Sequence, residues 1–166
     1  MSDNGRRLHV YADGCYDPLS QTGGWAFVAY RDGLEIASDF GRIDRSANNA
    51  MELRALLQAT RWINAHTASE AATLWCDSVY AVNGCNQWRH IWKNSGWRKK
   101  PSGSNARSRS IADRELWMAI DEALSKNGLL TVVWCKGHAG NPGNEKADML
   151  AEHGRRLSVA ASTRER

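Results

Sequence analysis

Four carboxylates stand at positions where a folded chain would bring them together. Asp13 and Asp77 each follow a short apolar, strand-like run, and the coarse fold makes these two strands neighbours. Glu52 falls in the first turn of a predicted helix, and Asp148 falls near the start of the last predicted helix. All four side chains can therefore project over the C-terminal edge of the predicted sheet, where α/β folds carry ligands.

Such a cluster would support metal-dependent phosphoryl transfer. Four ionised carboxylates in one place repel one another strongly, and divalent cations relieve that repulsion. Magnesium prefers oxygen ligands, and two ions roughly 3.5 to 4 Å apart can activate a water molecule and stabilise the leaving oxygen of a phosphodiester. The four acids thus predict a hydrolytic centre that binds magnesium.

Each acid taken alone also has an ordinary structural explanation. Asp13 precedes a glycine as in a turn, and Asp77 precedes a serine as at a helix N-cap. Glu52 completes a capping-box pattern with Asn49, and Asp148 is typical of a solvated helix face. Spacing alone leaves both interpretations open.

The hydrophobic pattern predicts the elements that would position these acids. Three strands in a meander come first, and helices and strands then alternate, which indicates a mixed sheet with helices on its faces. The predicted strands are residues 8–12, 24–30, 35–43, 72–76 and 129–135, and the predicted helices are residues 49–65, 78–87, 113–124 and 143–157.

Length and composition indicate one globular domain. The chain has 166 residues with 42% hydrophobic and 24% charged residues, which is typical of a single hydrophobic core. We expect the domain to span residues 1–157 and residues 158–166 to form a polar tail. No apolar run is long enough for a membrane helix or a signal peptide, so we expect a cytoplasmic protein. The four cysteines lack zinc spacing.

Positive charge is concentrated in one segment. Residues 88–112 contain seven lysines and arginines and no acid, although the net charge of the whole chain is only +4. Such clustering is typical of a surface that binds phosphates.

Four segments resemble the type 1 ribonuclease H family, and the resemblance extends in order over residues 8 to about 154. The segments are Tyr11-Ala12-Asp13-Gly14-Cys15, Asn48-Asn49-Ala50-Met51-Glu52-Leu53, Cys76-Asp77-Ser78, and the run from Trp134 to Asp148 that contains Lys136-Gly137-His138-Ala139-Gly140. The resemblance implies a five-stranded mixed sheet, with an antiparallel meander and two parallel strands, helices on both faces, and a basic protrusion at about 88–112.

The resemblance also implies the activity and the metal ligands. It implies an endonuclease that cuts the RNA strand of RNA/DNA hybrids with two Mg²⁺ ions, which Mn²⁺ can replace, and leaves 5′-phosphate and 3′-hydroxyl ends. Asp13, Glu52, Asp77 and Asp148 would hold the metal ions. His138 takes the position of a mobile loop, where a histidine can shuttle a proton or assist product release; a plain surface histidine is the alternative.

The resemblance further implies a set of substrate contacts. Asn48 and Asn49 would reach the minor groove, where 2′-hydroxyls distinguish RNA from DNA, and Cys15 and Ser78 would touch the RNA strand. The basic protrusion would bind the DNA strand through its aromatic and basic residues, Trp88, Lys93, Arg98, Lys99 and Lys100. A packing role for Trp88 and a merely solvated face for the basic residues are the alternatives.

Two residues depart from the family pattern. Ala47 stands where members often carry a threonine or serine that helps to seat a DNA phosphate, and alanine cannot form that hydrogen bond. Val79 stands where some members carry glutamine. We expect these changes to weaken or shift substrate binding and to spare the chemistry.

Two other hypotheses remain beside a hydrolase. One is a catalytically silent module that binds hybrids, which the presence of all four acids and His138 disfavours. The other is a piece of a larger nucleic-acid enzyme or a phage nuclease; the start at Met1 and the polar tail favour an independent protein. We expect a monomer without an obligate protein partner.

Overall fold

The computed structural model describes residues 7–45, 48–98 and 111–157 of the chain, without the side chains of Asn48 and Asn49. Its elements are, in order, β1 (Leu8–Asp17), β2 (Thr22–Arg31), β3 (Leu34–Asp44), α1 (Asn48–His66), β4 (Ala72–Cys76), α2 (Val79–Asn83), the π-helical turn η1 (Gly84–Trp88), α3 (Arg89–Asn94), α4 (Arg114–Ser125), β5 (Leu130–Trp134) and α5 (Pro142–Arg155).

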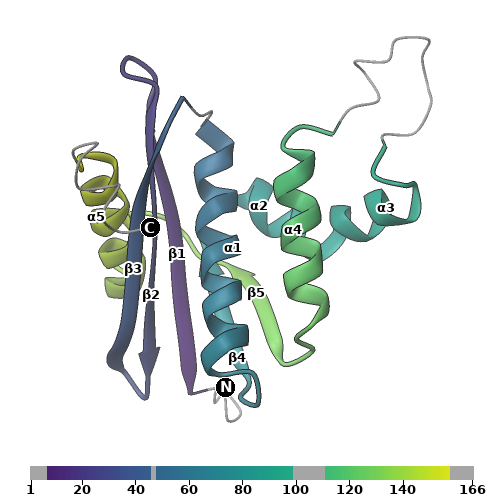
Figure 1. Ribbon diagram of the computed structural model, residues 1–166. Helices are drawn as coiled ribbons and strands as arrows, with labels where there is room; N and C mark the ends of the chain where they lie inside the picture. Colours follow the sequence, from purple (N-terminus) through teal and green to yellow (C-terminus); the bar gives the residue numbers. More distant parts are fainter. Residues whose placement is uncertain (1–6, 46–47, 99–110, 158–166) are drawn as a thin grey trace.

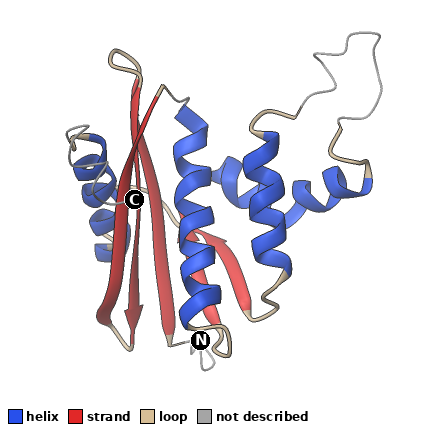
Figure 2. Ribbon diagram, viewed as in Figure 1, coloured by secondary structure: helices blue, strands red, loops and turns tan. Residues whose placement is uncertain are grey.

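The five strands form one mixed sheet in the order β3-β2-β1-β4-β5 (Figures 1 and 2). Strands β1, β2 and β3 pair antiparallel, and β4 pairs parallel with both β1 and β5. The tight connection between β2 and β3 uses Asp32 and Gly33, both with positive φ, as two-residue hairpin turns of type I′ require. The predicted fold class is therefore confirmed.

Helices cover both faces of the antiparallel part of the sheet. Gly23 and Gly24 are consecutive in β2, so their Cα–H bonds point to opposite faces. A Cβ on Gly23 would meet the side chain of Met51 in α1, whereas a Cβ on Gly24 would meet the backbone of Ala151 in α5. Helix α1 thus lies on one face and α5 on the other, as Figure 1 shows.

The core lies between the sheet and the helices α1 and α4. Trp117 of α4 is its largest fully buried side chain, and apolar residues of β1, β4 and α1 complete it. None of the helices in the described ranges is both long and apolar enough to cross a bilayer.

The prediction of one regular α-helix over residues 78–87 is wrong. The chain instead continues through α2, η1 and α3, with a π-helical turn in the middle. Gly84 begins that turn, and a Cβ there would collide with the indole ring of Trp117. The irregular turn accompanies this close packing, which depends on a residue of a distant helix.

Candidate functional site

Asp13 and Asp77 lie beside each other at the point where two strands separate. The parallel pairing of β1 and β4 ends at Ala12 and Cys76, so these two acids are the next residues of each chain segment. The prediction that Asp13 ends its strand is wrong, because β1 continues to Asp17 in its pairing with β2. The placement of the two acids at one edge of the parallel strands nevertheless agrees with the sequence pattern.

Glu52 approaches the same point from α1. It is the fifth residue of the helix, one residue later than predicted, because α1 begins at Asn48. A Cβ on Gly14 would lie 2.6 Å from the backbone nitrogen of Glu52, so only glycine allows this approach between β1 and α1. One carboxylate oxygen each of Glu52 and Asp77 and the sulfur of Cys76 lie within 4.8 Å of one another.

Asp77 has the most complete set of partners. Nδ2 of Asn144 in α5 donates a hydrogen bond to Asp77 Oδ2 over 3.3 Å, and Nε1 of Trp134 donates to the Asp77 carbonyl over 3.1 Å. A Cβ on Gly137 would lie 2.8 Å from Asp77 Oδ2. Sequence reasoning missed Asn144 and Trp134 as partners of Asp77, although both stand within the segment that carried the family resemblance.

Asp148 belongs to the same electrostatic group. It is half-buried and lies in the middle of α5, as the seventh of its 14 residues, and not near the helix start as predicted. Burial raises the pKa of the Asp13 carboxyl well above its usual range, and the charges of Glu52, Asp77 and Asp148 raise it further. Burial and the charge of Asp77 likewise raise the pKa of Glu52.

The donor set fits a divalent cation. Asp13 is only 4% exposed, and several carboxylates at such a place resist ionisation unless a positive charge accompanies them. The thiol of Cys76 donates to Glu52 Oε2 over 3.8 Å, and burial raises the pKa of this thiol, so it stays neutral. The carboxylate oxygens therefore remain as the metal ligands of the cluster, and hard cations such as Mg²⁺ prefer oxygen ligands.

His138 is exposed on the loop that follows β5. Its φ of 54° lies in the left-handed region, and Gly137 beside it approaches the Asp77 carboxylate. The loop therefore reaches the acidic cluster with His138 facing solvent. This arrangement is compatible with a proton shuttle and with a plain surface residue.

The predicted RNA-side contacts have different surroundings. Asn48 and Asn49 open α1, and their side chains fall outside the description. Ser78 is the N-cap of α2, where its Oγ accepts a hydrogen bond from the Ala81 amide over 3.1 Å. Burial, with a hydrogen bond to Glu152, raises the pKa of the Cys15 thiol to about 12. Ser78 and Cys15 thus have structural partners besides any role toward RNA.

The basic segment is described only in part. Trp88 is half-buried and packs between the rings of Tyr80 and Trp92 at centroid distances of 5.6 and 5.9 Å, so it has a packing role in this structure. Lys93 and Arg98 are exposed. Lys99 and Lys100 lie outside the described residues, as does Ala47, and Val79 is exposed at the first position of α2.

A hollow of about 790 Å³ lies between the start of α1 and the start of α4. Three arginines, Arg45, Arg54 and Arg114, line it together with Asp113 and Glu115. Nε of Arg54 is shielded from solvent and has no hydrogen-bond partner among the described residues. Sequence reasoning missed this group because its arginines come from three separate segments.

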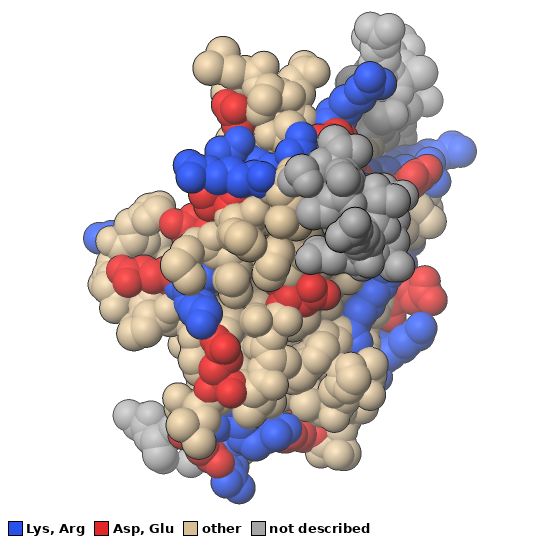
Figure 3. Space-filling model, turned by 60° about the vertical axis from the view of Figure 1, so that its left-hand side comes forward, with Lys and Arg blue, Asp and Glu red and all other residues tan. Residues whose placement is uncertain are grey.

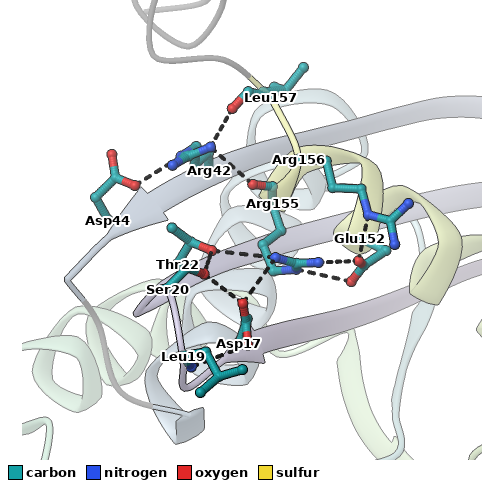
Figure 4. Close-up of polar contacts among 10 residues, drawn as sticks. All are labelled: Asp17, Leu19, Ser20, Thr22, Arg42, Asp44, Glu152, Arg155, Arg156 and Leu157. Atoms are coloured by element: carbon teal, nitrogen blue, oxygen red, sulfur yellow. Dashed lines mark hydrogen bonds and ion pairs between the residues drawn. The ribbon is translucent and has the colours of Figure 1, made fainter.

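A polar network fixes the far end of α5 to the β1–β2 hairpin (Figure 4). Arg155 forms ion pairs with Glu152 and, at 3.8 Å, with Asp17, and Arg42 donates to the Arg155 carbonyl over 3.2 Å. Because Asp148 lies on the same helix, this network helps to hold it over the sheet. On the face shown in Figure 3, acidic and basic side chains lie interspersed, with several basic ones gathered near its upper end.

Comparison with known proteins gives a family match over nearly the whole chain. The family model described as RNase H matches residues 5–156. A ribonuclease H of Hyphomonas neptunium is 35% identical over 147 residues, covering 89% of this chain and 91% of the relative. One of Acidovorax sp. is 37% identical over 146 residues, covering 87% of this chain and 92% of the relative.

Solved structures show the same fold. The crystal structure of LC9-RNase H1, described as a type 1 RNase H with the type 2 active-site motif, matches with a TM-score of 0.73 and 26% identity, covering 89% of this chain and 71% of that one. A foamy viral protease-reverse transcriptase in complex with dsDNA matches with a TM-score of 0.77 at 18% identity, covering 94% and 98%. This second likeness concerns the fold alone.

Proposed function

Because the chain belongs to the RNase H family, we propose that it acts as an endonuclease on RNA/DNA hybrids and leaves 5′-phosphate and 3′-hydroxyl ends. It is a ribonuclease H, which hydrolyses the RNA strand of such hybrids. The observation that carries the mechanism is the convergence of carboxylates at the end of the β1–β4 pairing, where Glu52 and Asp77 place oxygens within 4.8 Å of one another and of Cys76 Sγ.

Asp13, Glu52, Asp77 and Asp148 would hold two Mg²⁺ ions, or Mn²⁺ in their place. When bound, the metal ions lower the pKa of an attacking water and stabilise the charge on the leaving oxygen. The raised pKa values of Asp13 and Glu52 support this assignment, because they report carboxylates crowded together in a place of low solvation.

The other residues of the site orient these ligands. Asn144 donates to Asp77 Oδ2, which limits the rotation of that carboxylate. The indole N–H of Trp134 donates to the Asp77 carbonyl and helps to hold the backbone at this position. His138, on a loop next to Asp77, would carry a proton to or from the reacting groups, or assist the exit of the product.

The hybrid would lie across the start of α1. Asn48 and Asn49 would meet the minor groove, with Cys15 and Ser78 toward the RNA strand. Lys93, Arg98, Lys99 and Lys100 would contact phosphates of the DNA strand, with Trp88 packed beneath them. The hollow around Arg54 supports this path, since three arginines line it beside Ala50, the residue that follows the Asn pair. Nε of Arg54 has no hydrogen-bond partner among the described residues.

A cleavage assay tests the proposal. The protein is incubated with a labelled RNA/DNA hybrid, with double-stranded RNA and with double-stranded DNA, each with magnesium and with a chelator. We expect cleavage of the RNA of the hybrid alone, only with magnesium, and its loss in Asp77→Asn. Metal-independent cleavage, or a wild-type rate for Asp77→Asn, would contradict the metal assignment.

A catalytically silent hybrid-binding module is the second candidate, and binding without any metal-dependent product would favour it. A monomer and a cytoplasmic location remain predictions from the sequence. The chain covers about nine-tenths of the length of bacterial relatives that are themselves named ribonuclease H, which supports an independent enzyme.

A further inference from the structure

One buried carboxylate in α4 is shared by two cations of the basic segment. Asp121 has a side chain only 6% exposed. Its Oδ1 accepts a hydrogen bond from Nη1 of Arg89 over 2.7 Å, and its Oδ2 lies 3.3 Å from Nζ of Lys93. Arg89 opens α3 and Lys93 lies one turn later in the same helix, so these two cations of the basic protrusion meet a single negative charge.

The two cations differ in how firmly they are held. The Arg89 side chain is 13% exposed, and it also donates from Nε to the Cys85 carbonyl over 2.6 Å and from Nη1 to Ser125 Oγ over 3.4 Å. Lys93 has a side chain that is 54% exposed, and its contact with Asp121 is the longer one. Arg89 is therefore fixed, while Lys93 keeps most of its ammonium and stem in solvent.

The difference in exposure between Arg89 and Lys93 matters because Asp121 can neutralise only one of the two cations. A buried carboxylate that loses its counterion strongly destabilises the folded protein, so Asp121 must keep one cation at all times. Arg89 alone satisfies that requirement. One positive charge is left over, and it is on the exposed residue, where an anion can reach it.

We propose that Arg89 is a positioning residue that neutralises Asp121 and thereby frees Lys93 to bind a phosphate of the DNA strand. This inference rests on the proposed function and adds a reason why Lys93 is available to substrate. In a chain without Arg89, Lys93 would be the only counterion of Asp121 and would be withdrawn from the phosphate. The aspartate and the phosphate thus compete for the lysine, and Arg89 decides the competition.

A double-mutant cycle separates this role from simple packing. The measured quantity is the affinity for a hybrid in a chelator, by fluorescence anisotropy over a range of salt concentrations. We expect Arg89→Met to weaken binding several-fold and to lower the salt slope by about one, as for the loss of one phosphate contact. Adding Asp121→Asn should restore both values, because Lys93 is released.

Two control variants exclude trivial explanations. Glu122 is the neighbour of Asp121 in α4. Adding Glu122→Gln to Arg89→Met gives the same net charge as adding Asp121→Asn, but it leaves the Asp121 carboxylate in place, so it should not rescue binding. Arg89→Lys keeps a cation for Asp121 and should bind nearly as the wild type does. Rescue by Glu122→Gln to the same degree, or failure of Asp121→Asn to rescue, would overturn the proposal.

A measurement on the wild-type protein does not depend on the folding of any variant. Acetylation of lysines, read by mass spectrometry, should modify Lys93 in the free protein and should be slowed several-fold by bound hybrid. Lys126, paired with Glu122 at the C-terminal end of α4, is the internal reference. Absence of protection at Lys93 would also overturn the proposal.

The readouts distinguish this inference from the proposed function. Binding in a chelator requires no hydrolysis, so a protein that binds the hybrid without cutting it contradicts the function and leaves the role of Arg89 intact. Normal cleavage with an unchanged KM in Arg89→Met contradicts the role of Arg89 and leaves the function intact.

Discussion

The side-chain amide of Asn144 donates a hydrogen bond to Oδ2 of Asp77 over 3.3 Å. Asn144 is 2% exposed and is the third residue of α5, just after the N-cap Asn141. A buried amide that reaches from the last helix to a carboxylate after β4 links two elements of the site that are 67 residues apart. Its role can be tested without touching a proposed metal ligand.

Asn144→Asp should raise the magnesium concentration required for half-maximal activity by about tenfold. The new side chain has the same shape, but an ionised carboxylate cannot donate to Asp77 and adds negative charge beside it. The measurement is the initial rate of hybrid cleavage against magnesium concentration. Asn86→Asp, which removes the amide donor to the Val132 carbonyl away from the acidic cluster, is the control and should leave the magnesium requirement unchanged.

Asp13→Asn should abolish activity and yet raise the thermal stability of the metal-free protein by a few degrees. Asp13 is buried among Glu52, Asp77 and Asp148, so its ionised form destabilises the fold when no cation is present. The test is the Tm in chelator and in magnesium. Magnesium should raise the Tm of the wild type more than that of the variant, and the exposed Asp39→Asn should show neither effect. A Tm below that of the wild type in chelator would contradict the repulsion.

Much of this arrangement follows from the sequence because it depends on local patterns. Alternating and apolar runs predict the strands and their meander, and the acids after two apolar runs predict the edge of the sheet. These features need only a few neighbouring residues.

The remaining features depend on partners that are distant in sequence. The π-helical turn at Gly84 reflects the ring of Trp117, and the hydrogen bond between Cys15 and Glu152 joins β1 to α5. The sequence around Asn144 does not reveal which element its side-chain amide will face. Such tertiary contacts override local propensity, and a single sequence does not contain their geometry in readable form.

Glu152→Gln should make the protein less stable at pH 7 and less sensitive to acid. A hydrogen bond with Arg155 lowers the pKa of Glu152 from 4.5 to about 2 (Figure 4). Because the folded state binds this proton less readily than the unfolded chain, the stabilisation is complete above the ordinary pKa and is lost as the pH falls from about 4.5 to about 2.

The expected loss at pH 7 is at most about 1 kcal/mol, since the carboxylate is partly exposed and its pairing is screened by solvent. Urea unfolding between pH 7 and pH 2 measures it. The control is Glu122→Gln, at an exposed ion pair with Lys126 one turn later in α4. If the free energies of unfolding of the wild type and of Glu152→Gln changed equally with pH over the acidic range, the lowered pKa of Glu152 would be refuted.

Arg54→Met should raise the KM for hybrid several-fold, lower the salt slope by about one and spare kcat. The variant removes a guanidinium that lines the hollow beside the Asn pair, and it also removes an N–H with no partner among the described residues. An unsatisfied buried donor is unfavourable, so the stability should not fall as it would for a lost hydrogen bond.

Arg61→Met is the matched control for Arg54. Arg61 lies two turns later in α1, is exposed, and lines a separate hollow with Asn64 and Glu122. Steady-state kinetics at several salt concentrations should therefore separate the two variants. Equal changes in KM would indicate that only the net charge of the protein matters.

Gly14→Ala should reduce both stability and kcat, because the strand of Asp13 and the helix of Glu52 meet at this glycine. An added Cβ would lie 2.6 Å from the Glu52 nitrogen and the Met51 carbonyl oxygen, and backbone atoms cannot rotate away. The strand and helix must separate, at a cost of about 1–3 kcal/mol, and a shift near 1 Å between catalytic groups can cost up to about a hundredfold in rate.

Gly128→Ala is the control, since nothing lies within 4 Å of its added Cβ. It should retain activity and a Tm close to that of the wild type. Chemical denaturation and single-turnover cleavage of bound hybrid give the two quantities separately. If Gly14→Ala lost stability but kept the single-turnover rate, the distance between Asp13 and Glu52 would not limit the reaction. Loss of both would instead tie the rate to the close approach of β1 and α1.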